Sequence, residues 1–499
     1  MATVTAFERL NSAQRAAARF GVRDEGGGFG AGPLLIIAGA GTGKTNTLAH
    51  RVAHLILEGV SPERILLLTF TRRAAQEMTR RAQRIVAAVL AEKAGQGGAR
   101  AELAVKLTWS GTFHSIANRL IRRHAARVGL DANFSVLDRG DAADLMDVVR
   151  HELGLSRAEK RFPRKDTCLA IYSHRVNTQA PLADALAAVF PWCTDWEEEL
   201  VGLYRAYVER KLANQALDYD DLLLYWHAMA SDPSLAEEMG AQFDQILVDE
   251  YQDTNALQAE ILKALRPTGA GVTVVGDDAQ SIYSFRAATV ENILGFPAQY
   301  TPPATVVALK ENYRSTQGVL DAANALIAEG GRQYRKTLHA ARGTGERPRY
   351  VTVADDQAQA DYVVARVLET RERGVALKRQ AVLFRSSHHS DVLELELVRR
   401  NIPYVKYGGL KFLEAGHVKD MLAVLRWADN PKNRVSAFRA LQLLPGMGPA
   451  NAARCFTHFE AAGHDWRALA AFNASPLAAE AWPPFAELMV SLAVPDGPW

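Results

Sequence analysis

The clearest chemical signal in the sequence is a glycine-rich stretch, AGAGTGKT, at residues 38–45. It follows the apolar run PLLIIAG (33–39), which predicts a buried strand, and it precedes sequence that favours a helix. Glycines in such a turn let backbone N–H groups surround phosphate oxygens at a helix N-terminus. Lys44 would reach the β- and γ-phosphates, and Thr45 would ligate Mg²⁺. A chance glycine-rich turn is the alternative, but strand, lysine and threonine together predict a nucleoside triphosphate site.

A second stretch, ILVDEYQDTN (246–255), supplies the acids that such a site requires. Asp249, at the end of an apolar strand, would hold Mg²⁺, and Glu250 would orient and deprotonate the attacking water. The alternative is that both acids cap the next helix. Upstream, LNSAQRAA (10–17) places Gln14 where its amide could read adenine.

A third stretch, VGDDAQSIYSFRAA (275–288), combines two kinds of chemistry. Asp277, Asp278 and Gln280 suit a phosphate site. Tyr283 and Phe285, followed by an arginine, suit stacking on nucleobases, which tolerates any base sequence. The alternative is that these aromatic residues belong to the core, since aromatic side chains are usually buried.

The elements that must position these residues follow an α/β pattern. Short apolar runs predict buried strands, most of them followed by a turn and a helix, as in a parallel sheet covered by helices; they are 33–39, 64–70, 245–250, 272–277 and 305–309. Two later runs, 349–355 and 380–385, predict a second α/β unit. Residues from about 113 to 243, and those after 410, have helical spacing instead.

Length, charge and cysteine content limit the functions that the chain can have. The chain has 499 residues, 48% of them hydrophobic, with a net charge of only +2, so polyanion binding requires local basic patches. RAEKRFPRK (157–165) is a candidate patch for duplex DNA. Three widely spaced cysteines argue against a disulfide framework or zinc site. We see no signal peptide or apolar run of about 20 residues, so a cytoplasmic location without membrane attachment is expected.

The motifs, taken in order, resemble those of the superfamily-one DNA helicases of the UvrD/Rep/PcrA type. The resemblance covers almost the whole chain and rests on LNSAQ, AGAGTGKT, TFTRRAAQEMTRR, GTFHSIANRL, LDYDDLL, VDEYQDTN, VGDDAQSIYSFRAA and ENYRS. It implies an α/β fold with two RecA-like P-loop domains. The first would comprise 1–112 and 213–286, interrupted by a helical insertion at 113–212. The second RecA-like domain would be incomplete. Its first part would comprise 287–385, and part of its own helical insertion would comprise 386–499.

The resemblance also implies residue roles. ATP would contact Gln14, Ala38, Gly39, Ala40, Gly41, Thr42, Gly43, Lys44, Thr45, Tyr313 and Arg314, with Mg²⁺ on Thr45 and Asp249. Tyr313 would stack on adenine, while Gln280 would sense the γ-phosphate and Arg314 would act as an arginine finger from the second domain, beside the catalytic Glu250 and Lys44. DNA would contact Phe70, Thr71, Thr112, His114, Tyr283, Phe285 and Arg286. For His114 a phosphate or sugar contact is expected rather than catalysis. At least half of the nearby arginines are expected to lie on solvated helix faces.

Two departures from the family pattern limit these expectations. Asn46 stands where the family commonly has an arginine against the adenine, which removes a cation–π partner. The last two helicase motifs are absent, so we expect a truncated chain whose second unit has unpaired strand edges and an exposed apolar face. The leading hypothesis is an ATP-dependent 3′–5′ DNA helicase that binds single-stranded and duplex DNA in repair or replication. The alternatives are an ATP-gated DNA-binding module without unwinding activity and the motor subunit of a helicase–nuclease.

Overall fold

The computed structural model describes residues 6–23, 28–94, 107–155, 162–407 and 416–493. The chain divides into two compact units, residues 1–347 and 348–499. The motifs identified above lie in the first unit.

A six-stranded parallel sheet organises the first unit, with strand order β10-β3-β9-β8-β4-β5. The strands are β3 (Leu34–Ala38), β4 (Ile65–Leu68), β5 (Trp109–Gly111), β8 (Gln245–Val248), β9 (Val272–Gly276) and β10 (Thr305–Leu309). Because all are parallel, their carboxyl ends meet at one edge of the sheet, where ligands bind in α/β proteins. The loops after β3, β8 and β9 carry the phosphate, acid and aromatic motifs, so the topology brings the three motifs to the same edge.

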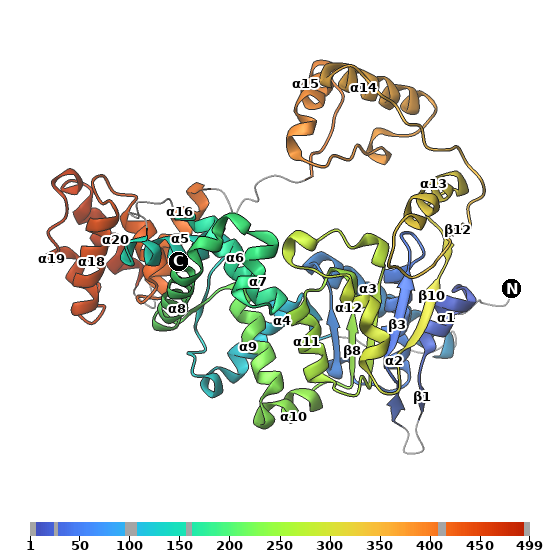
Figure 1. Cartoon of the computed structure of the whole chain (residues 1–499), viewed down its shortest axis with the longest axis horizontal. Helices are drawn as coiled ribbons and strands as arrows, with labels where there is room; N and C mark the ends of the chain where they lie inside the picture. Colours follow the sequence, from blue (N-terminus) through green and yellow to red (C-terminus); the bar gives the residue numbers. More distant parts are fainter. Residues whose placement is uncertain (1–5, 24–27, 95–106, 156–161, 408–415, 494–499) are drawn as a thin grey trace. The chain divides into compact units, whose positions relative to one another are not determined.

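The four central strands are buried on both faces. Every residue of β3, β4, β8 and β9 is buried, and helices lie on both faces of the sheet (Figure 1). This burial explains why the strands are continuous apolar runs rather than alternating ones. The helices that accompany the sheet are α1 (Ser12–Arg19), α2 (Lys44–Leu57), α3 (Arg72–Ala94), α11 (Ala256–Leu265), α12 (Glu291–Gly295) and α13 (Gln317–Ala328).

The chain between β5 and β8 is helical, as the sequence predicted. It forms α4 (Phe113–His124), α5 (Arg139–Glu152), α6 (Lys165–Thr178), α7 (Leu182–Val189), α8 (Glu197–Ala213), α9 (Tyr219–Ser231) and α10 (Pro233–Ala241). A short parallel pair, β6 (Ser135–Val136) and β7 (Ala216–Leu217), connects the segment after α4 with the segment after α8. The proposed duplex-binding patch at 157–165 lies largely outside the described residues, and the described Lys165 pairs with Asp144 at 2.6 Å.

Two placements differ from the sequence-based prediction. β10, assigned to the second motor domain, is the edge strand of the first sheet, because its apolar residues pair in register with β3. The ENYRS segment follows directly and belongs to the first unit as well. There β11 (Glu311–Asn312) pairs with β12 (His339–Ala340), while β1 (Val22–Arg23) pairs with β2 (Phe29–Gly30). The exact domain boundaries remain predictions.

The expected strands at 349–355 and 380–385 are not strands in the structure. Their backbone has no ladder partner among the described residues. Their apolar side chains are exposed, Tyr350 by 94% and Leu383 by 92%. A strand forms only when a neighbour satisfies its backbone groups, so the apolar pattern alone did not produce a sheet.

The remainder of the second unit is helical. It comprises α14 (Asp356–Glu372), α15 (Asp391–Arg399), α16 (Gly416–Asp429), α17 (Arg434–Leu441), α18 (Pro449–Ala461), α19 (Ala468–Ala471) and α20 (Trp482–Leu492). The fully buried Trp427 centres an aromatic core, with its ring 5.2 Å from Trp466 and 5.6 Å from Phe459.

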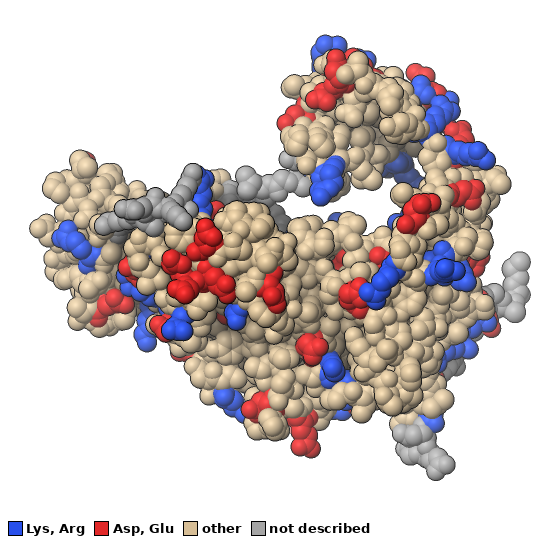
Figure 2. Space-filling model, in the orientation of Figure 1, with Lys and Arg blue, Asp and Glu red and all other residues tan. Residues whose placement is uncertain are grey.

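The surface carries charges of both signs (Figure 2), and the cysteines form no disulfide among the described residues. On the face drawn in Figure 2, basic and acidic side chains are interspersed. All three cysteines are buried free thiols. In the described part of the chain, no helix has both the length and the apolar character needed to cross a bilayer.

Candidate nucleotide and nucleic-acid site

The loop between β3 and α2 has the backbone that a phosphate site needs. Gly41 and Gly43 adopt φ values of 79° and 87°, which side chains rarely tolerate. Gly43 is the N-cap of α2 and makes no side-chain cap bond, so the first N–H groups of this helix can serve an anion. The loop therefore combines a helix N-terminus with Lys44, the first residue of that helix.

Lys44 lies against the acid motif. Its Nζ donates to Glu250 Oε2 at 2.8 Å, and the lysine side chain is buried. Glu250 has φ 52°, an uncommon conformation for a residue with a Cβ, which costs roughly 1–2 kcal/mol. Gln252 Nε2 also donates to Glu250 Oε2, at 3.0 Å. The carboxylate is thus held at the phosphate-binding loop by two donors.

The carboxylates near Lys44 outnumber the cations. Burial and the neighbouring Glu250 raise the pKa of Asp249 to about 7, and the same two causes raise the pKa of Asp253 to about 6. Asp253 Oδ1 is buried without a hydrogen-bond partner. These desolvated oxygens fit a divalent cation, which would favour their ionised forms. No set of three or more candidate metal ligands occurs among the described residues.

The ENYRS segment contacts the phosphate-binding loop directly. The Tyr313 N–H donates to the Gly41 carbonyl at 2.9 Å, and the Asn312 side chain donates to the Ala40 carbonyl. A Cβ on Gly41 would lie 2.7 Å from Arg314 Cβ, so only glycine allows this approach. We expected this segment across a cleft in the second domain; that placement is corrected, because β10 delivers it from the first sheet. The arginine-finger role of Arg314, whose side chain is exposed, stays a prediction.

The two side chains expected to contact adenine, Gln14 and Tyr313, both form hydrogen bonds within the protein. Gln14 is buried, and its Nε2 donates to the Thr42 carbonyl at 2.9 Å. Asn11 Nδ2 donates to Glu311 Oε2 at 3.0 Å and to the Tyr313 hydroxyl at 2.9 Å. Gln14 therefore supports the phosphate-binding loop, while Asn11 and Glu311 fix the partly exposed Tyr313 ring. Adenine contact by Gln14 and Tyr313 stays a prediction.

Tyr283 and Phe285 of the third motif form a partly exposed cluster with Phe70. The Tyr283 ring lies 4.8 Å from Phe70 and 5.7 Å from Phe285. The Arg286 guanidinium carbon lies 5.5–5.8 Å from all three ring centres. Phe285 is 72% exposed and Phe70 37%, so the core interpretation is wrong for Phe285. Three rings with a cation above them have the composition of a stacking platform for nucleobases. We call this set the aromatic cluster.

The remaining candidate DNA contacts lie at helix N-termini. Thr71 accepts from the Ala74 N–H at 3.1 Å, and Thr112 is the N-cap of α4. Burial lowers the pKa of His114 to about 4, so its imidazole is neutral at pH 7. In the free protein it is therefore a hydrogen-bonding group and not a cation. Contact of these three residues with DNA stays a prediction.

A buried glutamine joins the acid motif to the aromatic motif. Gln252 bonds Glu250 through its Nε2, and its Oε1 accepts the Asp277 N–H at 2.9 Å. Gly276 must be glycine here, since a Cβ would lie 2.6 Å from Gln252 Oε1. Sequence reasoning missed Gln252, Asn312 and Asn11. Their positions inside recognised motifs were the only available signal.

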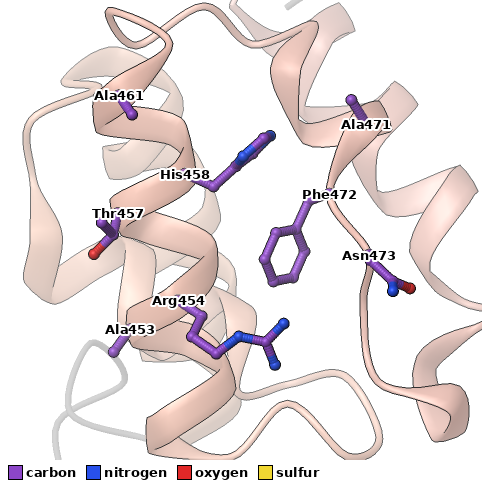
Figure 3. Close-up of a pocket in the computed structure, with 8 residues that line it drawn as sticks. All are labelled: Ala453, Arg454, Thr457, His458, Ala461, Ala471, Phe472 and Asn473. Atoms are coloured by element: carbon purple, nitrogen blue, oxygen red, sulfur yellow. The ribbon is translucent and has the colours of Figure 1, made fainter.

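A hollow of about 600 Å³ in the second unit lies between α18 and the segment after α19 (Figure 3). His458 Nε2 lies 3.1 Å from the Ala468 carbonyl, and the Arg454 guanidinium carbon lies 5.7 Å from the centre of the Phe472 ring. These contacts hold α18 and the segment after α19 together. We therefore attribute the side chains that line the hollow to local packing.

Comparison with known proteins agrees with this geometry. Residues 26–301 match the model of the UvrD/REP helicase N-terminal domain, and residues 307–460 match that of the UvrD-like helicase C-terminal domain. The chain is similar to ATP-dependent DNA helicase PcrA of Staphylococcus aureus, with 35% identity over 425 residues. That alignment covers 84% of this chain and 55% of the relative.

A second similar protein is ATP-dependent DNA helicase PcrA of Staphylococcus epidermidis, with 35% identity over 432 residues, 86% of this chain and 56% of the relative. The chain therefore spans about half the length of the curated relatives it matches. Because the N-terminal family model alone covers more than half of the chain, and its residues build the phosphate, acid and aromatic motifs described above, the chain belongs to the UvrD/REP helicase family.

Proposed function

We propose that this chain is an ATP-dependent DNA motor that binds single-stranded DNA and unwinds duplex DNA with 3′–5′ polarity. The observation that carries the proposal is the hydrogen-bonded path from Lys44 through Glu250 and Gln252 to Asp277, the start of the segment that ends in the aromatic cluster. Events at the phosphate-binding loop therefore have a short physical route to the proposed DNA-binding rings. The relatives' printed names, ATP-dependent DNA helicase, support the same conclusion.

In this proposal the first unit binds ATP. The α2 N-terminus and Lys44 hold the phosphates, and Glu250 accepts a proton from the attacking water. Mg²⁺, held by Thr45 and Asp249, would neutralise charge on the phosphates. Lys44 leaves its ion pair with Glu250 to meet the phosphates, which frees the carboxylate to act as a base.

On the DNA side, Phe70, Tyr283 and Phe285 stack on successive bases, and Arg286 contacts the backbone. Stacking is worth about 1–3 kcal/mol per base whatever the sequence, which suits a motor on arbitrary DNA. In this proposal the motor acts in DNA repair or replication in the cytoplasm.

The alternative, an ATP-gated DNA-binding module without unwinding activity, predicts DNA binding that responds to the nucleotide and no strand displacement.

The test measures ATP hydrolysis with and without oligo-dT, and strand displacement on duplexes with 3′ or 5′ single-stranded tails. A motor shows DNA-stimulated hydrolysis and prefers the 3′ tail. Nucleotide-dependent DNA binding without displacement supports the gated module instead. Lys44→Ala is the control: it should abolish every nucleotide effect and preserve nucleotide-free DNA binding. Absence of both hydrolysis and any nucleotide effect in the wild-type chain would refute both candidates.

A further inference from the structure

Lys336 is a buried cation that lies outside the motifs identified in the sequence. Its Nζ lies 2.5 Å from Asp277 Oδ1 and also forms an ion pair with Asp278. The three side chains are 5%, 3% and 2% exposed. A lysine is rarely buried this deeply unless its charge is paired. Both partners belong to the motif that begins after β9, so Lys336 anchors the start of that motif.

Asp277 is the point where this anchor meets the nucleotide site. Its N–H donates to Gln252 Oε1 at 2.9 Å, and its Oδ2 accepts from the Gln280 side chain. Gln252 in turn bonds Glu250, which bonds Lys44. The Asp277 carboxylate therefore contacts both Lys336 and Gln280. The Asp277 backbone N–H continues the path through Gln252 toward the phosphate-binding loop.

The segment that carries Lys336 contacts the same edge of the sheet at further points. The Tyr334 N–H donates to Asp278 Oδ2 at 2.9 Å. Leu338 lies over the phosphate-binding loop, so closely that a Cβ on Gly39 would approach its Cδ2 to 2.6 Å. β12 then pairs with β11, the strand that begins the ENYRS segment. Residues 334–340 thus touch the phosphate, aromatic and ENYRS motifs.

We propose that Lys336 is a positioning residue that holds the 277–286 segment against the nucleotide site, so that the nucleotide state controls the position of the aromatic cluster. This inference rests on the proposed function and names the residue that couples its two halves. In this proposal Lys336 acts through Asp277 and Asp278 and not by contacting nucleotide or DNA itself.

The physical reason is the balance of buried charge. With Lys336 present, Asp277 keeps a compensating cation even when the Gln280 amide leaves it for a phosphate. Without the lysine, two adjacent buried carboxylates lose their cation. Asp277 then retains Gln280 as its remaining side-chain donor, or the segment opens to water. In either case, movement of the 277–286 segment no longer follows the nucleotide.

The experiment measures the dissociation constant of fluorescein-labelled oligo-dT with ADP and with a non-hydrolysable ATP analogue, and takes the ratio of the two constants. The variants are Lys336→Met, which removes the charge, and Lys336→Arg, which keeps it. Lys211→Met is a matched control. Lys211 is 1% exposed and lies 2.7 Å from Asp218 and 2.6 Å from Asp221, in the helical part of the first unit, so its loss also leaves two buried carboxylates without their cation.

Lys336→Met and Lys211→Met should both lower the melting temperature. Only Lys336→Met should bring the ratio of the two constants to within twofold of one, and Lys336→Arg should restore it at least in part. A wild-type ratio retained by Lys336→Met, or lost equally in Lys211→Met, would overturn the role of Lys336 and leave the proposed function intact. A wild-type protein whose DNA affinity does not depend on the nucleotide would overturn this inference, and only if it also failed to hydrolyse ATP would the proposed function be refuted.

Discussion

Replacing Phe285 by alanine tests the DNA-binding surface most directly. The Phe285 ring is 72% exposed and lies at the end of the aromatic cluster, 5.7 Å from Tyr283. Because most of the ring is already in water, its removal exposes little apolar surface, and the stability of the fold should change little. The loss should appear in DNA binding. One stacked base is worth about 1–3 kcal/mol, so the dissociation constant for single-stranded DNA should rise about 5- to 150-fold.

Fluorescence anisotropy at one fixed salt concentration measures this change on labelled oligo-dT and on an oligonucleotide of mixed sequence. The two substrates should lose affinity by similar factors, because every base offers a face for stacking. Leu326→Ala is the matched control, since Leu326 is 74% exposed on α13 in the same unit. If the Phe285→Ala and Leu326→Ala variants both bind DNA within twofold of the wild-type affinity, the Phe285 ring does not stack on DNA.

Three further predictions concern charge. Arg286→Ala should lower the slope of log affinity against log salt concentration by about 0.7, as expected for one lost phosphate contact to single-stranded DNA, whereas Phe285→Ala should leave the slope unchanged; equal slopes for both would remove the phosphate role. Glu250→Gln should lower kcat for ATP hydrolysis by about 10²–10⁴-fold with a small change in KM, because it removes the base and keeps an acceptor for Lys44; steady-state kinetics above wild-type KM decide this. Burial and the nearby Asp218 raise the pKa of Asp220 to about 6 from an ordinary value of 3.8, so the folded protein binds more protons than the unfolded chain between about pH 4 and 6, and stability falls as pH rises through that window. Asp220→Asn should therefore gain at most about 3 kcal/mol over wild type at pH 8 and little at pH 4 in urea unfolding; a destabilised variant at pH 8 would show that the charged form is the favoured one.

The sequence by itself determined the phosphate-binding loop, the acid motif and the strands that carry them. AGAGTGKT and VDEYQDTN are local patterns in which each residue type is required by the backbone or by the phosphate, and the structure joins them through the 2.8 Å contact of Lys44 with Glu250. The buried strands were equally readable, because a strand covered on both faces must be apolar throughout. The helical region between β5 and β8 followed from its residue spacing.

Only the tertiary structure decided where ENYRS lies and which residues connect the motifs. β10 reads as a strand in either domain, and its pairing with β3 is a long-range choice that no local pattern records. The runs at 349–355 and 380–385 have strand composition, yet they lack partners, since a sheet is a property of neighbours and not of one segment. Lys336 gave no signal at all: a single lysine in a loop is ordinary, and its role depends on two carboxylates nearly 60 residues away along the chain. Local chemistry is therefore written in the sequence, whereas the contacts between distant segments depend on how the packed chain satisfies its buried backbone and charges.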